Sequence, residues 1–98
     1  MTSSRLKAID DEQYNIRMEL TIPQAKMYRL GIEIASLIDI YPDQQQRTEI
    51  ASKLKQEHKT YKDICSNLLK KYKMLTSEKH NIQQNSFENI IKISYINE

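Results

Sequence analysis

The sequence predicts a mainly α-helical protein. We expect an antiparallel helical hairpin with one long helix, flanked by a short N-terminal strand and by a C-terminal segment that fits a strand or a short helix. Three observations support this fold class. Residues 43–98 contain neither glycine nor proline. Apolar residues recur at helical spacing on both sides of Pro42, and an alternation of apolar and polar residues precedes the first of the two helices.

The N-terminal part divides into a flexible segment and a strand. Residues 1–13 are polar, and we expect them to be flexible or only loosely attached. Over residues 14–22 apolar and polar side chains alternate, as in a half-buried strand. A helix is the alternative, because apolar residues also occur at heptad-like spacing here, interrupted by Gln13. These residues are Leu6, Ile9, Ile16 and Leu20.

Residues 24–41 are predicted to form the first helix. Pro23 suits its first turn, and the residue before a proline favours extended backbone. Gly31 lies beside the main apolar stripe, where it either permits close approach of another backbone or is tolerated at a cost of about 1 kcal/mol. The main stripe is Met27, Leu30, Ile34, Leu37, Ile38 and Tyr41, and a second apolar flank is Tyr28, Ile32 and Ala35.

Residues 43–75 are predicted to form the long helix. Pro42 ends the first helix, and Asp43 can cap the second. The first helix, with about 18 residues, would cover the long helix only to about residue 62. The apolar residues between 64 and 75 would therefore extend past its end and need other cover. The stripe is Ile50, Leu54, Tyr61, Ile64, Cys65, Leu68, Tyr72 and Leu75.

The C-terminal part is predicted to be a connector followed by a short element. Residues 77–86 are polar and typical of a connector. In residues 87–96, Ile91, Ile93 and Tyr95 alternate with polar side chains, which favours a strand over a short helix. This element and the strand at 14–22 could cover the free end of the long helix within one chain, or exchange with a second copy.

Composition indicates a single small domain of 98 residues. The lone Cys65 excludes an intrachain disulfide and fits a reducing compartment. No apolar run approaches the roughly 20 residues that span a bilayer, and the first residues lack the apolar centre of a signal peptide. We therefore expect a soluble cytoplasmic protein that does not bind a membrane.

Nothing in the sequence indicates catalysis. His58 and His80 are far apart and stand in no metal-ligand spacing. Cys65 lies on the apolar stripe, where a buried small hydrophobe is the usual role, and a chain with one glycine cannot build a phosphate loop. We expect no enzyme activity, metal, cofactor or small-molecule substrate. Glu57, in the centre of the stripe, either sets the register of a helix–helix seam or marks a solvated stretch.

The first functional hypothesis is a protein-interaction or regulatory adaptor. The uncovered apolar end of the long helix would bind a second copy, giving a homodimer, or dock a different protein partner. The residues expected to form this surface are Ile64, Leu68, Leu69, Tyr72 and Leu75.

The alternative is a DNA-binding regulator. The order strand, proline, helix, turn, helix over residues 14–59 resembles that of the ribbon-helix-helix repressors, with NIRMELTIP as the ribbon and RTEIA (47–51) as the start of the second helix. The resemblance implies a dimer whose ribbon enters the major groove, with Asn15, Arg17 and Thr21 facing the bases. A basic face opposite the apolar stripe either contacts nucleic-acid phosphates or is simply solvated. It consists of Lys55, Lys59, Lys62, Lys70 and Lys73.

Overall fold

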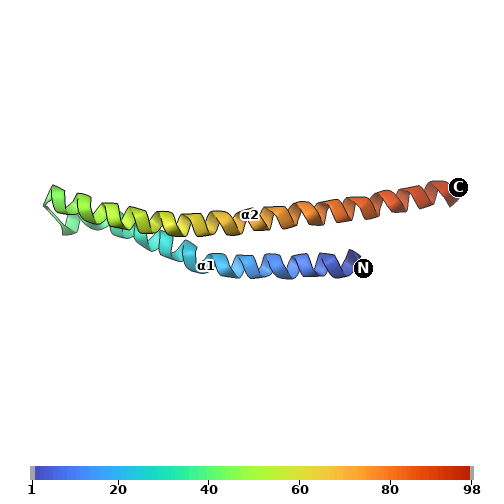
Figure 1. The fold of residues 1–98 in the computed structure, drawn as a ribbon, viewed down its shortest axis with the longest axis horizontal. Helices are drawn as coiled ribbons and strands as arrows, with labels where there is room; N and C mark the ends of the chain where they lie inside the picture. Colours follow the sequence, from blue (N-terminus) through green and yellow to red (C-terminus); the bar gives the residue numbers. More distant parts are fainter. Residues whose placement is uncertain (1, 98) are drawn as a thin grey trace.

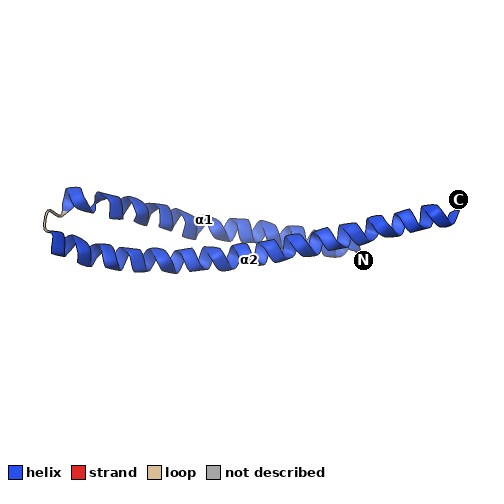
Figure 2. Cartoon of the chain, turned by 90° about the horizontal axis from the view of Figure 1, so that it is seen from above, coloured by secondary structure: helices blue, strands red, loops and turns tan. Residues whose placement is uncertain are grey.

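Two long helices account for the whole fold. The computed structural model describes residues 2–97, and the surroundings of side chains over residues 3–87. Helix α1 (Thr2–Ile40) and helix α2 (Gln44–Asn97) run antiparallel and meet at one tight turn (Figures 1 and 2). The molecule measures 80 × 19 × 16 Å, and its radius of gyration is 22.8 Å, against about 13 Å for a compact domain of this size. The predicted helical hairpin is therefore confirmed, as an extended rod.

The predicted strands are wrong. Residues 14–22 lie inside α1, residues 87–96 lie inside α2, and no strand occurs between residues 2 and 97. The supposed connector 77–86 and the supposed flexible segment 1–13 are helical as well, residue 1 lying outside the described residues. The local alternation over 14–22 is overridden by a longer pattern, since one heptad repeat crosses the whole of α1 and includes Gln13.

Both helices carry an unbroken heptad repeat along their contact. Every described residue of the repeat is buried or half-buried. In α1 these residues are Leu6, Ile9, Gln13, Ile16, Leu20, Pro23, Met27, Leu30, Ile34 and Leu37. In α2 they are Arg47, Ala51, Leu54, His58, Tyr61, Cys65, Leu68, Tyr72, Leu75, Lys79, Ile82 and Ser86. Such spacing is the pattern of a coiled coil, and we call the contact between these two rows the seam.

The seam changes the expected position of several residues. Glu57 is exposed and His58 occupies the seam, so Glu57 does not set the register of the two helices. Its exposure agrees with the alternative, a solvated stretch of the stripe. Ile38 is 68% exposed and Ile64 is 42% exposed, although both were assigned to the buried stripes. The reason is the period: a straight helix of 3.6 residues per turn drifts by about 20° per heptad against a 3.5-residue repeat. Over a helix this long, that drift moves residues from the edge of the stripe into solvent.

The turn follows the predicted capping. The Gln45 N–H donates to Asp43 Oδ1 at 3.1 Å, and the Arg47 N–H donates to the Asp43 carbonyl at 3.0 Å. Asp43 is therefore the N-cap of α2, as predicted. The Arg47 guanidinium donates to the Tyr41 carbonyl at 3.2 Å and ties the turn to α2.

Pro23 lies in the middle of α1, not in the first turn of a helix. It is buried in the seam. Because proline has no N–H, the carbonyl of Glu19 lacks its usual partner, and the ring crowds the preceding turn. Figure 1 shows α1 changing direction in its light-blue segment, which contains this residue. The tertiary seam holds the helix together across a residue that would end an isolated helix.

An overhang exists, but at a different place. Because α1 begins at Thr2, it covers the part of α2 that was expected to be free. With 54 residues against 39, α2 is the longer helix, and its last turns project past the N-terminus of α1 (Figure 1). The seam extends to Ser86, so the uncovered end of α2 begins beyond that residue instead of at residue 64.

Gly31 does not serve a close approach. A Cβ built on this residue meets nothing within 4 Å, its φ is negative, and the residue is exposed. Gly31 therefore affects stability only through the conformational entropy that it loses when the helix forms.

We therefore expect Gly31→Ala to stabilise the hairpin by about 1 kcal/mol. Urea unfolding followed by circular dichroism measures the change. Lys55→Ala is the control, because Lys55 is also exposed within a helix and lysine and alanine differ little in helix propensity. A loss of stability in Gly31→Ala would show that the glycine is needed for packing.

Candidate interaction surfaces

Three of the five predicted partner-binding residues are part of the seam. Leu68, Tyr72 and Leu75 pack against a buried cluster formed by Ile16 and Leu20 of α1 and by Cys65 of α2. Ile64 and Leu69 are each 42% exposed. Their heptad positions place them on opposite sides of the seam. The structure thus does not bring the five residues together on one outward surface.

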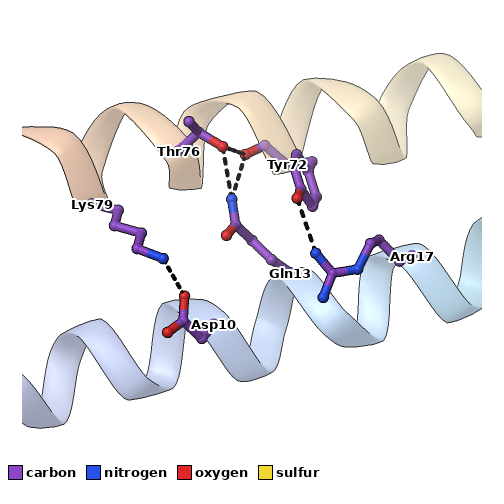
Figure 3. Close-up of polar contacts among 6 residues, drawn as sticks. All are labelled: Asp10, Gln13, Arg17, Tyr72, Thr76 and Lys79. Atoms are coloured by element: carbon purple, nitrogen blue, oxygen red, sulfur yellow. Dashed lines mark hydrogen bonds and ion pairs between the residues drawn. The ribbon is translucent and has the colours of Figure 1, made fainter.

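A polar cluster occupies the seam beside these apolar residues (Figure 3). Gln13 is 6% exposed. Its amide nitrogen donates to the Tyr72 carbonyl at 3.2 Å and to Thr76 Oγ1 at 2.7 Å. Nearby, Arg17 donates to the Tyr72 hydroxyl at 3.1 Å. These bonds form in only one alignment of the two helices, so the cluster fixes their register.

Two ion pairs fasten the N-terminal end of α1 to α2. Lys79 Nζ lies 2.6 Å from Asp10 Oδ1 (Figure 3). Arg5 donates two hydrogen bonds of 2.7 Å to the two carboxylate oxygens of Glu78, in the bidentate geometry that guanidinium groups favour. These bonds lower the pKa of Glu78 and raise the pKa of Arg5. The Arg5–Glu78 pair therefore makes the end of the hairpin sensitive to acid.

A groove runs along one side of the seam. Near the N-terminus of α1 it has a volume of ≈ 400 Å³ and a mainly apolar floor. Charges of opposite sign, Glu12 of α1 and Lys71 of α2, line its two sides. Farther along, Lys26 and Glu57 line a second hollow in the same way. Complementary charges across a seam favour this antiparallel alignment. The residues lining the first groove are Glu12, Ile16, Lys71, Met74, Leu75 and Glu78.

The residues expected to face DNA do not form a ribbon. Asn15, Arg17 and Thr21 are exposed residues of a helix. The Arg17 guanidinium is directed at Tyr72, and Thr21 Oγ1 donates to the Met18 carbonyl at 2.6 Å. The strand that the ribbon-helix-helix resemblance requires is therefore absent over residues 14–22. The five lysines of the basic face (Lys55, Lys59, Lys62, Lys70 and Lys73) are all exposed on α2.

The side chains with reactive groups are far apart. Cys65 is buried and its thiol lies 3.7 Å from the sulfur of Met27. Along the axis of α2, Cys65 is about 10.5 Å from His58 and about 22 Å from His80. No histidine is thus within hydrogen-bonding distance of the thiol, as a nucleophile and base would need. Among the described residues, no three potential ligands gather around a metal position.

The surface that sequence reasoning missed is the back of α1, away from α2. There five large apolar side chains are at least half exposed: Tyr14 (56%), Met18 (53%), Ile22 (65%), Tyr28 (74%) and Ile32 (50%). Part of the signal was recognised as the second apolar flank at Tyr28, Ile32 and Ala35. The continuation of this flank to Tyr14 was not predicted, because Pro23 indicated a boundary between a strand and a helix.

Over the residues that the structure describes, neither helix has the length of apolar sequence that crossing a membrane requires.

Gln13 provides a test of whether polar bonds in the seam determine the register of the two helices. Replacing Gln13 by leucine adds apolar surface to the seam and removes the bonds that fix the register. We expect Gln13→Leu to gain about 1 kcal/mol in stability and to form several species on size-exclusion chromatography. Gln24→Leu, at an exposed position of the same helix, is the control. A less stable variant that remains one species would contradict this role.

The Arg5–Glu78 pair predicts an acid response. Because the pKa of Glu78 is lowered from its ordinary value of 4.5, its stabilising effect is present above that value and is lost as the pH falls through the lowered pKa. Glu78→Gln should therefore melt at a lower temperature than the wild type at pH 7, and the two midpoints should converge as the pH falls below the lowered pKa of Glu78. Glu49→Gln, exposed on the same helix, is the control. A constant difference between Glu78→Gln and wild type at all pH values would exclude this role.

Comparisons with family models, with curated proteins and with solved structures found no match to this chain.

Proposed function

We propose that this protein is a non-enzymatic coiled-coil interaction module that acts by self-association. The observation that carries the proposal is the amount of apolar surface left outside the seam. Over the described residues, every fully buried side chain and most of the half-buried ones belong to the single seam row of each helix. Exposed large apolar residues occur along the whole rod, from Tyr14 to Phe87. Five of them follow one another along the back of α1 from Tyr14 to Ile32, and an exposed apolar patch of this kind marks interaction sites in soluble proteins.

The hairpin is also poorly suited to stand alone. Besides Pro23, six apolar residues are buried among those described. Two helices in contact can bury only one stripe each, whereas a helical bundle buries two or more faces of every helix. Further helices packed against the hairpin would supply the missing cover. This argument supports association between hairpins, and it applies equally to a helix from a different protein.

The interacting surface differs from the one expected from sequence. The apolar stripe of α2 is mostly committed to the seam through Leu68, Tyr72 and Leu75. Only its flanks, at Ile64 and Leu69, remain available. Over the described residues, the exposed large apolar side chains of α1 outnumber those of α2 and form a longer surface. We therefore place the proposed interaction on the outside of the hairpin.

A DNA-binding regulator receives less support. The exposed lysine face of α2 could supply salt-dependent affinity for phosphates. The ribbon that would read bases is helical, and a single basic helix face is more often only solvated. No further observation favours this alternative.

Sedimentation equilibrium tests the proposed function. Between about 5 and 500 μM protein, a range that covers weak to moderate affinities, we expect the mass to rise above the 11.6 kDa of one chain. Heat-stable helical circular dichroism at the higher concentrations should accompany the rise, because association adds apolar burial. A constant mass of 11.6 kDa across the range would overturn self-association.

A further inference from the structure

The back of α1 carries a second heptad repeat. The seven residues of this row follow one another at alternating steps of four and three, which is the spacing of a coiled-coil contact. They lie opposite the seam, and we call them the outer row. The outer row consists of Tyr14, Met18, Thr21, Ala25, Tyr28, Ile32 and Ala35, and all seven residues are exposed.

The outer row is almost free of charge. Beside it, Asn15, Ile22, Arg29 and Ser36 complete the outward face of α1 between residues 14 and 36, and Arg29 is its one ionisable group of fixed charge. The backs of solvated coiled-coil helices are normally charged. On α2 this holds, since Lys59, Asp63, Lys70 and Lys73 occupy the corresponding side. The back of α1 has instead the composition of a surface that packs against a helix.

The two aliphatic hydroxyl groups on this face, those of Thr21 and Ser36, are already hydrogen-bonded. Thr21 Oγ1 donates to the Met18 carbonyl at 2.6 Å, and Ser36 Oγ donates to the Ile32 carbonyl at 2.8 Å. Because both hydroxyls are bonded to their own helix, they can be covered by another helix without losing a hydrogen bond to water. Thr21 then contributes its methyl group to the contact.

The sizes of the side chains make the outer row complementary to itself. We propose that the outer row binds the outer row of a second copy, antiparallel, with Ala25 at the two-fold axis. In this alignment Tyr14 meets Ala35 of the other copy, and Thr21 meets its Tyr28. Met18 meets its Ile32, and the two Ala25 residues meet at the centre. Large residues thus face small ones in the Tyr14–Ala35 and Thr21–Tyr28 contacts, each of which occurs twice, as interdigitated packing requires. One interface patch serves both copies.

The area of this face suits a stable dimer. The five large side chains are between 50% and 74% exposed. At roughly 100 Å² of exposed surface each, they supply roughly 500 Å² per copy. The smaller residues between them bring the area toward the roughly 800 Å² per partner of a specific interface. The assembly would have four helices, with the two α1 helices inside and the two α2 helices, with their lysines, outside.

This inference rests on the proposed self-association and adds its surface and its symmetry. A cysteine experiment tests the symmetry. In a Cys65→Ala background, Ala25→Cys places two thiols at the two-fold axis, where their Cα atoms can approach to disulfide distance. We expect a disulfide-linked dimer in an oxidising glutathione buffer. Asp11→Cys in the same background is the control, because antiparallel pairing puts residue 11 opposite residue 39.

The cross-linking pattern separates the pairing modes. Cross-linking at residue 25 alone supports the antiparallel pairing. Equal cross-linking at residues 11 and 25 would indicate parallel pairing, and none at residue 25 in a variant that still dimerises would indicate a different surface. Either result overturns the inference.

A second measurement leaves the native cysteine in place. Met18→Lys combined with Ile32→Lys puts charges into the proposed interface, at residues that are half exposed in the hairpin. We expect the dimer dissociation constant to rise about 100-fold while circular dichroism still shows a helical hairpin. The control, Met74→Lys, changes an exposed residue of α2 and should leave the dissociation constant within about threefold.

The outcomes distinguish this inference from the proposed function. If the wild type associates and the Met18→Lys, Ile32→Lys variant associates equally well, the outer row is not the interface, although self-association stands. If the wild type stays at the mass of one chain at every concentration, the proposed function and this inference both fail.

Discussion

The structure depends on one contact, the heptad seam between two antiparallel helices. Burial of apolar surface is the main source of stability, and in a hairpin only the facing row of each helix can be buried. The chain meets this constraint by extending the contact. The seam runs from the turn at Pro42 to the N-terminal end of α1, and it includes nearly every side chain that the structure describes as buried. The full length of 80 Å is that of α2, which continues past the end of the seam.

A long, uniform seam creates a second problem, because apolar rows can slide by one heptad at little cost. The chain offers specific contacts against sliding. Gln13 bonds Tyr72 and Thr76 from within the seam, Arg5 binds Glu78, and Asp10 binds Lys79. All lie near the N-terminus of α1, far from the turn that fixes the other end. Turn and polar contacts therefore pin the register at both ends.

The sequence allowed the hairpin, its turn and the cap at Asp43 to be predicted, because Pro42 and the apolar spacing are local signals. The continuity of α1 could not be predicted in the same way. Pro23 is a strong signal for a helix boundary, and here the seam on both sides of it outweighs the lost hydrogen bond. Gln13 interrupted the apolar row in the sequence, yet in the structure it is a bonded member of that row. The positions of Pro23 and Gln13 within one continuous helix can be explained only from the contacts of α1 with α2.

The outer face of α1 could not be predicted for the same reason. A helix boundary at Pro23 divides its apolar row into two unrelated segments. Once α1 is a single helix, the two helices differ clearly on their backs. The back of α2 carries Lys59, Lys70 and Lys73 together with the single acid Asp63, and the lysines disfavour packing of another such face by repulsion. The back of α1 has a single Arg29 over residues 14–36. Repulsion on one side and exposed apolar surface on the other leave α1 as the helix against which a second hairpin can pack.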